Sequence, residues 1–144
     1  MQHKDFSQST CPVARGLDLV GEWWSIMILR DAFFGFTRFD QFQKSLDISP
    51  GMLTKRLNAM VENGLLERRA YSQKPVRHDY VLTDRAKAFF PVLAALTDWG
   101  NGVFEGQGVR REVVDTATGV IAEPLMIDRL TGKPIDADGF HFST

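Results

Sequence analysis

The side chains in this chain that could carry catalysis are few and widely separated. Cys11 with His78 could be imagined as a nucleophile and its base, and Asp31 with Asp40 as a pair of carboxylates. Neither pair stands in a motif with a required spacing, and the cysteine–histidine proteases use folds for which 144 residues of helical character are a poor match. A glycine-rich phosphate loop is also missing from the sequence. The sequence therefore predicts a binding protein with no catalytic residues.

The candidate ligands for a metal are equally sparse. The histidines, His3, His78 and His141, are scattered and form no ligand motif, so we expect no metal site and no cofactor. The single cysteine excludes an internal disulfide and fits a reducing cytosol. No apolar run reaches the roughly 18 residues of a membrane span, and the start lacks the apolar region of a signal peptide. We therefore expect a cytoplasmic protein that does not bind membranes.

The charges of the chain are unevenly distributed. The net charge is −1, but residues 49–80 carry six basic and three acidic side chains, and residues 105–144 carry four basic and seven acidic ones. The central segment is therefore +3 and the C-terminal segment −3. A basic centre can meet DNA despite an acidic tail, because attraction to phosphate is local at physiological ionic strength.

The first half of the chain is predicted to form four helices. Thr10 is the expected cap of the first helix, which begins at Pro12 and which Gly21 closes. Residues 22–34 are apolar nearly all round and should form a core helix. The remaining elements are a short helix over 38–46, a turn over 47–50, and a helix over 50–63 that ends at Gly64.

A ribbon and a long helix are predicted next. Residues 67–71 and 76–82 read as strands joined by a turn over 72–75, and Thr83 should cap a helix over 84–104. This last helix has more apolar surface than a terminal helix of a small domain needs, and burial against a second subunit would explain it. The residues predicted for the dimer interface, together with two from the first helix, are Val13, Leu17, Phe89, Phe90, Leu93, Leu96, Trp99 and Val103.

The C-terminal segment differs in composition from the rest. It is rich in Gly, Asp and Thr, and it repeats an Asp-x-x-Thr-Gly motif at Asp115–Gly119 and Asp128–Gly132. Each motif predicts a hairpin turn, with Asp bonding forward to the backbone and Gly at positive φ. We expect an N-terminal extension over 1–10, a domain over 11–105 and a β-hairpin tail over 106–144.

Two short helices, a tight turn and a two-stranded ribbon follow one another in the order of a winged helix-turn-helix. The fold expected is mainly α with a small β wing (α+β), with a long dimerisation helix and the hairpin tail. The helix over 50–63 would be roughly 21 Å long and could enter a major groove about 12 Å wide. Its apolar residues cluster on one side, which leaves the other side for DNA. The residues predicted to contact DNA are Ser49, Gly51, Met52, Thr54, Lys55 and Arg56, with Arg38 before the first helix of the pair and Lys74, Arg77 and His78 on the wing.

Alternatives remain open for these residues. Lys55 and Arg56 could be ordinary solvated helix residues, and a ribbon with two basic side chains is common on protein surfaces. Thr54 and Arg56 flank the proposed face, so they either reach phosphate or hold the helix in place. The fold could also serve as a winged-helix module for protein contacts without DNA readout, and the modest net charge keeps that alternative open.

Several segments, in their order and spacing over about residues 11–104, resemble the HxlR family of transcriptional regulators. They are Cys11-Pro12-Val13-Ala14, Val20-Gly21-x-Trp23-Trp24-Ser25, Arg38-Phe39, Ile48-Ser49-Pro50-x-Met52-Leu53-Thr54-x-Arg56-Leu57, Gly64-Leu65-Leu66-Glu67-Arg68, Tyr80-x-Leu82-Thr83 and Asp98-Trp99-Gly100. The resemblance implies a dimer, related in fold to MarR proteins, that binds a palindromic operator in double-stranded DNA and pairs through its first and last helices.

The sequence departs from the family pattern at three places. Position 23 is commonly basic in the family and is Trp here, and Gly51 stands where a basic residue is frequent. The tail looks like the Cys-x-x-Cys-Gly ribbon that ends some longer relatives, but its cysteines are missing, which makes structural zinc unexpected. DNA affinity or base choice is therefore expected to differ from that of the relatives.

The resemblance also implies a signal. In several HxlR-family members a cysteine near the first helix senses oxidants or electrophiles, and Cys11 matches that position. A thiol at a helix N-terminus lies at the positive end of the dipole, although free cysteine is more often a small buried apolar residue. A small-molecule effector between the long helices is a further possibility, in a pocket lined by the aromatic residues Trp23, Trp24, Phe33, Phe89, Phe90 and Trp99.

Overall fold

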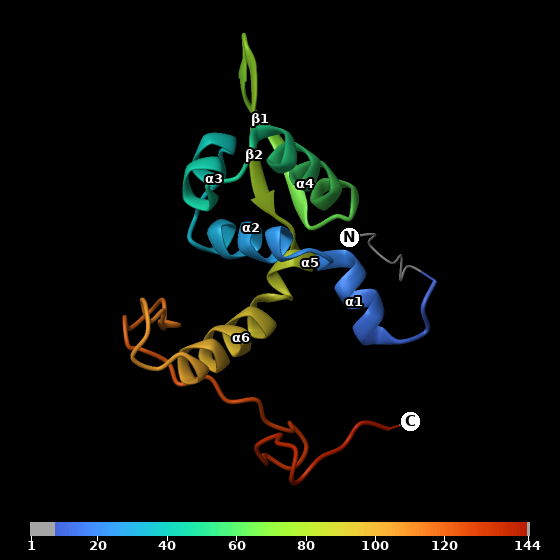
Figure 1. The fold of residues 1–144 in the computed structure, drawn as a ribbon, viewed down its shortest axis with the longest axis vertical. Coiled ribbons are helices and arrows are strands. Elements are labelled where there is room, and N and C mark those ends of the chain that lie inside the picture. Colours follow the sequence, from blue (N-terminus) through green and yellow to red (C-terminus); the bar gives the residue numbers. More distant parts are fainter. Residues whose placement is uncertain (1–7, 144) are drawn as a thin grey trace. The chain divides into compact units, whose positions relative to one another are not determined.

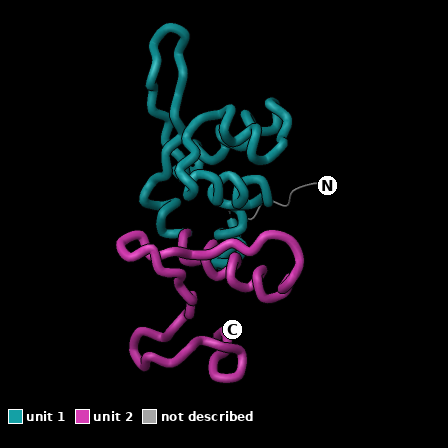
Figure 2. Tube along the Cα trace, turned by 90° about the vertical axis from the view of Figure 1, so that its left-hand side faces the viewer, with its two compact units in different colours: residues 1–89 teal, residues 90–144 magenta. Residues whose placement is uncertain are grey.

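The computed structural model describes residues 8–143, which fall into two compact units divided between Phe89 and Phe90 (Figure 2). The first unit contains α1 (Pro12–Val20), α2 (Trp23–Phe33), α3 (Phe39–Leu46), α4 (Pro50–Glu62), β1 (Leu66–Gln73), β2 (Val76–Leu82) and α5 (Asp84–Lys87), and the second begins with α6 (Phe90–Val103). Helices followed by a two-stranded ribbon confirm the winged helix-turn-helix predicted from sequence (Figure 1). The division into three segments at residues 10 and 105 stays a prediction.

Both ends of α4 are defined by local sequence. Ser49 caps the helix, its hydroxyl accepting a hydrogen bond from the Met52 N–H at 3.4 Å, and Pro50 occupies the first turn. At the other end Gly64 adopts φ +69°, and the N–H groups of Gly64 and Leu65 donate to the carbonyls of Val61 and Met60. This closing pattern needs a left-handed residue, which glycine supplies without strain. The predicted start and stop of α4 are confirmed.

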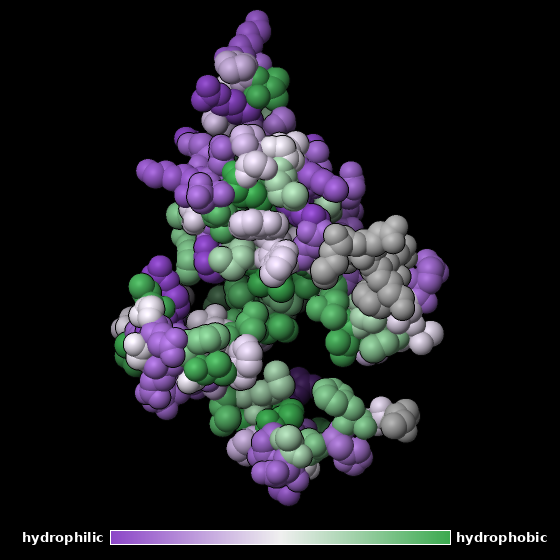
Figure 3. Space-filling model, viewed as in Figure 1, coloured by the Kyte–Doolittle hydropathy of each residue, from purple (hydrophilic) through white to green (hydrophobic). Residues whose placement is uncertain are grey.

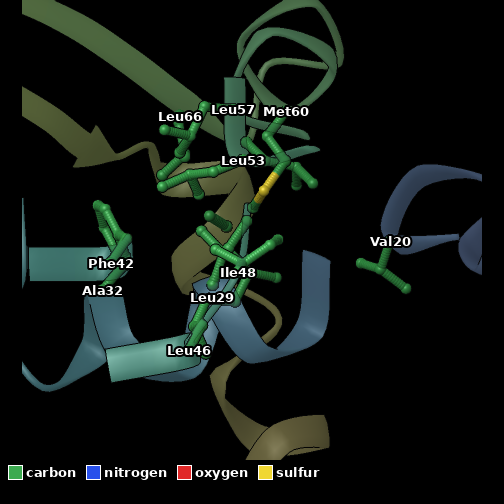
Figure 4. Close-up of a cluster of buried hydrophobic side chains, with 13 residues drawn as sticks. Val20, Leu29, Ala32, Phe42, Leu46, Ile48, Leu53, Leu57, Met60 and Leu66 are labelled. Carbon is green, nitrogen blue, oxygen red and sulfur yellow. The ribbon is translucent and has the colours of Figure 1, made fainter. Parts of the chain in front are cut away.

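The core of the first unit gathers the inner faces of three helices and the start of the ribbon (Figure 4). Leu53, Leu57 and Met60 of α4 are fully buried with Phe42 of α3 and Leu29 of α2. Burying side chains of this size stabilises by about 1.5–3 kcal/mol each. The apolar face of α4 is therefore firmly fixed, and its opposite face is left to the surface.

The ribbon is tied to the helices at its base. β1 and β2 are antiparallel, with Leu66 opposite Leu82 and Gln73 opposite Val76, and an irregularity between Ala70 and Ser72. The N–H of Tyr80 donates to the Thr37 carbonyl at 2.7 Å, which links β2 to the loop before α3. Beyond this link the ribbon projects from the helices as a wing (Figure 1).

Two predicted details are wrong. The cap position of α1 is Cys11 rather than Thr10, and no side chain makes a capping hydrogen bond there. The helix predicted over 84–104 is interrupted at residues 88 and 89, giving a short α5 and a separate α6. Pro91 explains the interruption, because it has no N–H to donate and its ring would clash with the carbonyl four residues earlier.

The second unit consists of α6 and a tail with little regular structure. Single antiparallel bridges pair Val114 with Ile121 and Ile127 with Pro134, so the two expected hairpins are present in minimal form. Hydrogen bonds from the backbone of Thr118 and Ala117 hold the pKa of Asp115 below its usual value. The Thr131 hydroxyl and the Leu130 N–H do the same for the pKa of Asp128. The carboxylates thus hold the turns in their ionised form.

Within residues 8–143, no helix is both long and apolar enough to cross a membrane.

Thr83 offers a test of how the ribbon joins the helices. Its hydroxyl accepts from the Ala86 N–H at the start of α5 and donates to the Gly64 carbonyl at 2.6 Å. We expect T83A to lower the free energy of unfolding by about 1–2 kcal/mol, since it removes a cap and leaves a carbonyl short of a partner. Urea denaturation measures the loss, and T83S, which keeps the hydroxyl, serves as the control. Equal stability of T83A and the parent chain would contradict this role.

Candidate nucleic-acid interface

The exposed surface of α4 begins at its first turn. Ser49, Gly51, Met52, Thr54 and Lys55 are all exposed, and only the three residues 47–49 separate this end of α4 from α3. The hydroxyl of Thr54 donates to the Pro50 carbonyl at 2.8 Å, so Thr54 is partly engaged by its own helix. The N-terminal residues of α4 therefore form a continuous surface opposite the buried leucines.

Gly51 has no packing reason to be glycine. A Cβ added there would meet no heavy atom within 4 Å, and glycine inside a helix costs roughly 0.5–1 kcal/mol relative to alanine. A side chain is therefore missing at the centre of the exposed surface, where a partner can approach the backbone closely.

Adjacent basic residues on α4 have different environments. Arg56 turns inward and forms an ion pair with Glu22, just before α2, and its side chain is only 13% exposed. Lys55 is exposed and has no acidic partner among the described residues. Of the two roles predicted for Arg56, holding the helix in place is the one this geometry supports.

A polar cavity lies beside this ion pair. It has a volume of about 370 Å³ and lies between α1, α2 and α4. Charged side chains of both signs line it, namely Asp18, Glu22, Lys55 and Arg56. The Nε of Arg56 is buried there without a hydrogen-bond partner.

The wing carries two further exposed cations of the candidate interface. Lys74 and Arg77 are exposed near its tip and have no acidic partner within the described range, whereas His78 is half-buried opposite Ala70. Together with Lys55 they place positive charge on α4 and on the ribbon. Figure 3 shows hydrophilic side chains over the wing and the helices beside it.

Arg38, at the cap position of α3, is held in place by the wing. Its guanidinium lies 4.7 Å from the centre of the Tyr71 ring and 3.9 Å from the Asp79 carboxylate. The Thr37 hydroxyl also donates to Asp79, at 2.9 Å. Arg38 remains 54% exposed, so it can still reach a phosphate while it fixes the wing against α3.

Sequence reasoning missed a contact between the wing and α4. Arg68 on β1 donates a hydrogen bond to the Asn58 side chain and lies over the Tyr80 ring, 5.9 Å from its centre. Asn58 and Arg68 are ten residues apart in the sequence, and only the tertiary structure pairs this position of α4 with β1. Arg69, the next residue, pairs with Glu67 at 3.3 Å.

The predicted dimer residues fall into two groups. Val13 and Leu17 of α1, and Phe90, Leu96, Trp99 and Val103 of α6, are exposed apolar side chains. Leu93 is buried and Phe89 packs against the core of the first unit, so these two contribute less free surface. The exposed group matches what an unfilled interface would present.

The residues predicted for the sensor and for the effector pocket differ in their exposure. Cys11 is an exposed free thiol. Trp24, Phe33 and Phe89 pack against the core, while Trp23 is 80% exposed. Among the described residues no group of three His, Cys, Asp or Glu side chains is placed to hold a metal ion.

Comparisons with known proteins agree with this geometry. The chain belongs to the HxlR-like helix-turn-helix family, whose model matches residues 19–107. It is 38% identical over 126 residues to an uncharacterised HTH-type transcriptional regulator of Mycobacterium tuberculosis, covering 87% of this chain and 80% of the relative. The chain is therefore a helix-turn-helix transcriptional regulator by family.

Solved structures share the fold. The crystal structure of PA1607, described as a candidate transcription factor, has a TM-score of 0.86 and 37% identity, covering 97% of this chain and 99% of that one. A candidate transcription factor from Pseudomonas aeruginosa, PA1374, has a TM-score of 0.65 and 46% identity, with 93% and 92% covered. The redox regulator HypR in its reduced form has a TM-score of 0.62 and 27% identity, with 66% and 95% covered.

The ion pair between Arg56 and Glu22 can be tested without DNA. We expect R56A and E22A each to lower the free energy of unfolding by about 1–3 kcal/mol, because each leaves a partly buried charge unpaired. The double variant should lose about 1 kcal/mol less than the sum of the two single losses. Chemical denaturation measures this cycle, with K55A as the control that leaves stability unchanged. Strictly additive losses would show that the pair does not hold α4.

Proposed function

We propose that this chain binds double-stranded DNA as a homodimer and regulates transcription from a palindromic operator. The observation that carries the proposal is the placement of three unpaired cations, Lys55 on α4 and Lys74 and Arg77 on the wing, around an exposed helix whose other face is fixed in the core. In this fold the second helix of the pair enters the major groove and the wing reaches the flanking backbone.

Each contact has an assigned role in the proposal. Lys55, Met52 and Ser49 lie where base edges would be reached, and the bare backbone at Gly51 allows close approach. Lys74, Arg77 and the exposed guanidinium of Arg38 meet phosphates, which position the protein but carry no sequence information. Arg56 and Arg68 act indirectly, since their contacts to Glu22 and Asn58 hold α4 and the wing in register.

The dimer supplies the second half of the site. Val13, Leu17, Trp99 and Val103 are the exposed apolar residues through which two copies would pair. Two copies related by a twofold axis would present two α4 helices to half-sites about 10–10.5 base pairs apart.

Charge-removing variants test the DNA surface. We expect K55A and R77A each to weaken binding to the DNA upstream of the gene for this chain by about 1–3 kcal/mol per half-site. Each should also reduce the slope of log affinity against log salt by about 2, because the homodimer loses one contact in each half-site. Gel-shift titrations at two salt concentrations measure both quantities. K133A, which removes a lysine of the tail, is the matched control and should bind normally.

Two outcomes would contradict the proposal. Unchanged affinity in both K55A and R77A would show that the binding surface lies elsewhere. No binding of any duplex at low salt would favour the alternative, a winged-helix module that contacts proteins.

We further propose that Cys11 makes DNA binding responsive to oxidants or electrophiles. Its thiol is exposed at the start of α1, next to the apolar residues proposed for pairing, and the fold is shared with the redox regulator HypR. Two Cys11 thiols, one from each copy, could lose two electrons and two protons to an oxidant such as diamide and form a disulfide. An aldehyde would instead add to a single thiolate.

Serine substitution tests this sensor. We expect diamide, hypochlorite or an aldehyde to release the parent chain from its operator, and C11S to stay bound under the same treatment. Gel shifts report release, and mass spectrometry with and without a reductant identifies the product. Equal release of C11S and the parent chain would end the case for Cys11, although DNA binding itself would stand.

A further inference from the structure

The tail of the second unit, residues 106–144, exposes many large apolar side chains to solvent, which is unfavourable in water. Residues 109–142 include ten large apolar side chains that are exposed, and Leu130 and Phe142 each retain 93% of their accessible area. Figure 3 shows hydrophobic side chains among hydrophilic ones on this segment. The ten are Val109, Val114, Val120, Ile121, Leu125, Met126, Ile127, Leu130, Ile135 and Phe142.

The tail has a defined backbone but no core of its own. Its hairpins are closed by single bridges and by turns centred on Asp115 and Asp128, and every large apolar side chain of residues 109–135 named above is at least 43% exposed. An isolated two-stranded hairpin is marginal in water, so further packing is needed to hold this shape. The likeness to the crystal structure of PA1607 extends over 97% of this chain, which includes most of the tail.

We infer that the tail packs on a second copy of this chain, so that each subunit straps the other. The inference rests on the homodimer proposed above and extends its interface beyond the helices. A segment that makes few contacts within its own chain can be stabilised by burying its apolar residues against a partner.

The tail is continuous with α6, which supports a second copy of the chain as the partner on which the tail packs. The side-chain amide of Asn101 donates to the Arg111 carbonyl at 2.5 Å, and its oxygen accepts from the Arg111 N–H at 3.2 Å. This pair of bonds anchors the start of the tail to the helix that carries the exposed residues Trp99 and Val103. A partner that covers α6 therefore also meets the beginning of the tail.

Charge is the second argument. Residues 105–144 carry −3 and the whole chain −1, so residues 1–104 carry +2. Two tails facing each other would repel, whereas a tail facing the rest of a second copy is attracted. Among interfaces between two copies, the charges therefore favour one in which each tail lies on the main body of its partner over one in which the two tails meet.

The available area is the third argument. Ten side chains that each keep about 100 Å² exposed offer about 1,000 Å² per chain, and a stable interface needs about 800 Å² per partner. The tail is thus large enough to contribute much of a dimer interface by itself.

The experiment compares two variants of the full chain. L125S/L130S/F142S removes three of the most exposed apolar side chains of the tail, and E123S/R129S is a matched polar control that leaves the net charge unchanged. Dilution series in the analytical ultracentrifuge give the dissociation constant of self-association. We expect the apolar variant to raise it by about tenfold or more and the control to leave it unchanged.

A photocrosslinking residue in place of Leu130 tests which copy the tail meets. Mixed ¹⁵N-labelled and unlabelled chains should give crosslinked peptides that pair a heavy with a light copy. Crosslinks confined to one copy, or equal dissociation constants for both variants and the parent chain, would overturn the inference.

The outcomes separate this inference from the proposed function. If the parent chain dimerises and binds DNA while the apolar variant behaves like it, only the role of the tail is wrong. If the parent chain stays monomeric and ignores duplexes, the proposed dimeric regulator and the strap both fail.

Discussion

The burial of one face of α4 is the constraint on which the rest of the structure depends. Leu53, Leu57 and Met60 are fully buried against α2, α3 and the start of β1, and their burial fixes the rotation of the helix about its axis (Figure 4). Because successive residues advance by roughly 100°, fixing these three decides that Gly51 and Lys55 face outward. The ability of the chain to meet a partner through this helix follows from the packing of its opposite side.

Polar contacts then divide the basic residues by role. Arg56 is held by Glu22, Arg68 by Asn58 and Tyr80, and Arg38 by Tyr71 and Asp79. These contacts link the helix-turn-helix to α2 and to the wing. Lys55, Lys74 and Arg77 have no acidic partner in the described part of the chain and remain available for an external anion.

Much of the first unit could be predicted because its signals are local. Ser49, Pro50 and Gly64 mark the ends of α4 within a few residues of the backbone groups they satisfy. The break before α6 also has a local signal, because Pro91 stands inside the helical pattern. The apolar spacing continues on both sides of Pro91, and it led to the incorrect prediction of one continuous helix. The pairings of Arg56 and Arg68 could not be predicted, because each partner lies on another element and only the fold brings them together.

The residues that match the HxlR-like family include both α4 and the wing. The HxlR-like match covers residues 19–107 and rests on sequence similarity, whereas the exposure of α4 and the free cations of the wing rest on packing and charge. The tail lies mostly beyond that match. Its repeated Asp-x-x-Thr-Gly turns are held by hydrogen bonds to the Asp carboxylates, whereas the turns of a zinc ribbon are held by a metal ion bound to cysteines.

Protection of guanine N7 from dimethyl sulfate would test most directly whether α4 enters the major groove, since N7 is exposed only there. On a bound operator we expect two protected patches centred about 10–10.5 base pairs apart, one for each α4 of the dimer. Full methylation of every guanine in a duplex that the protein demonstrably binds would contradict it.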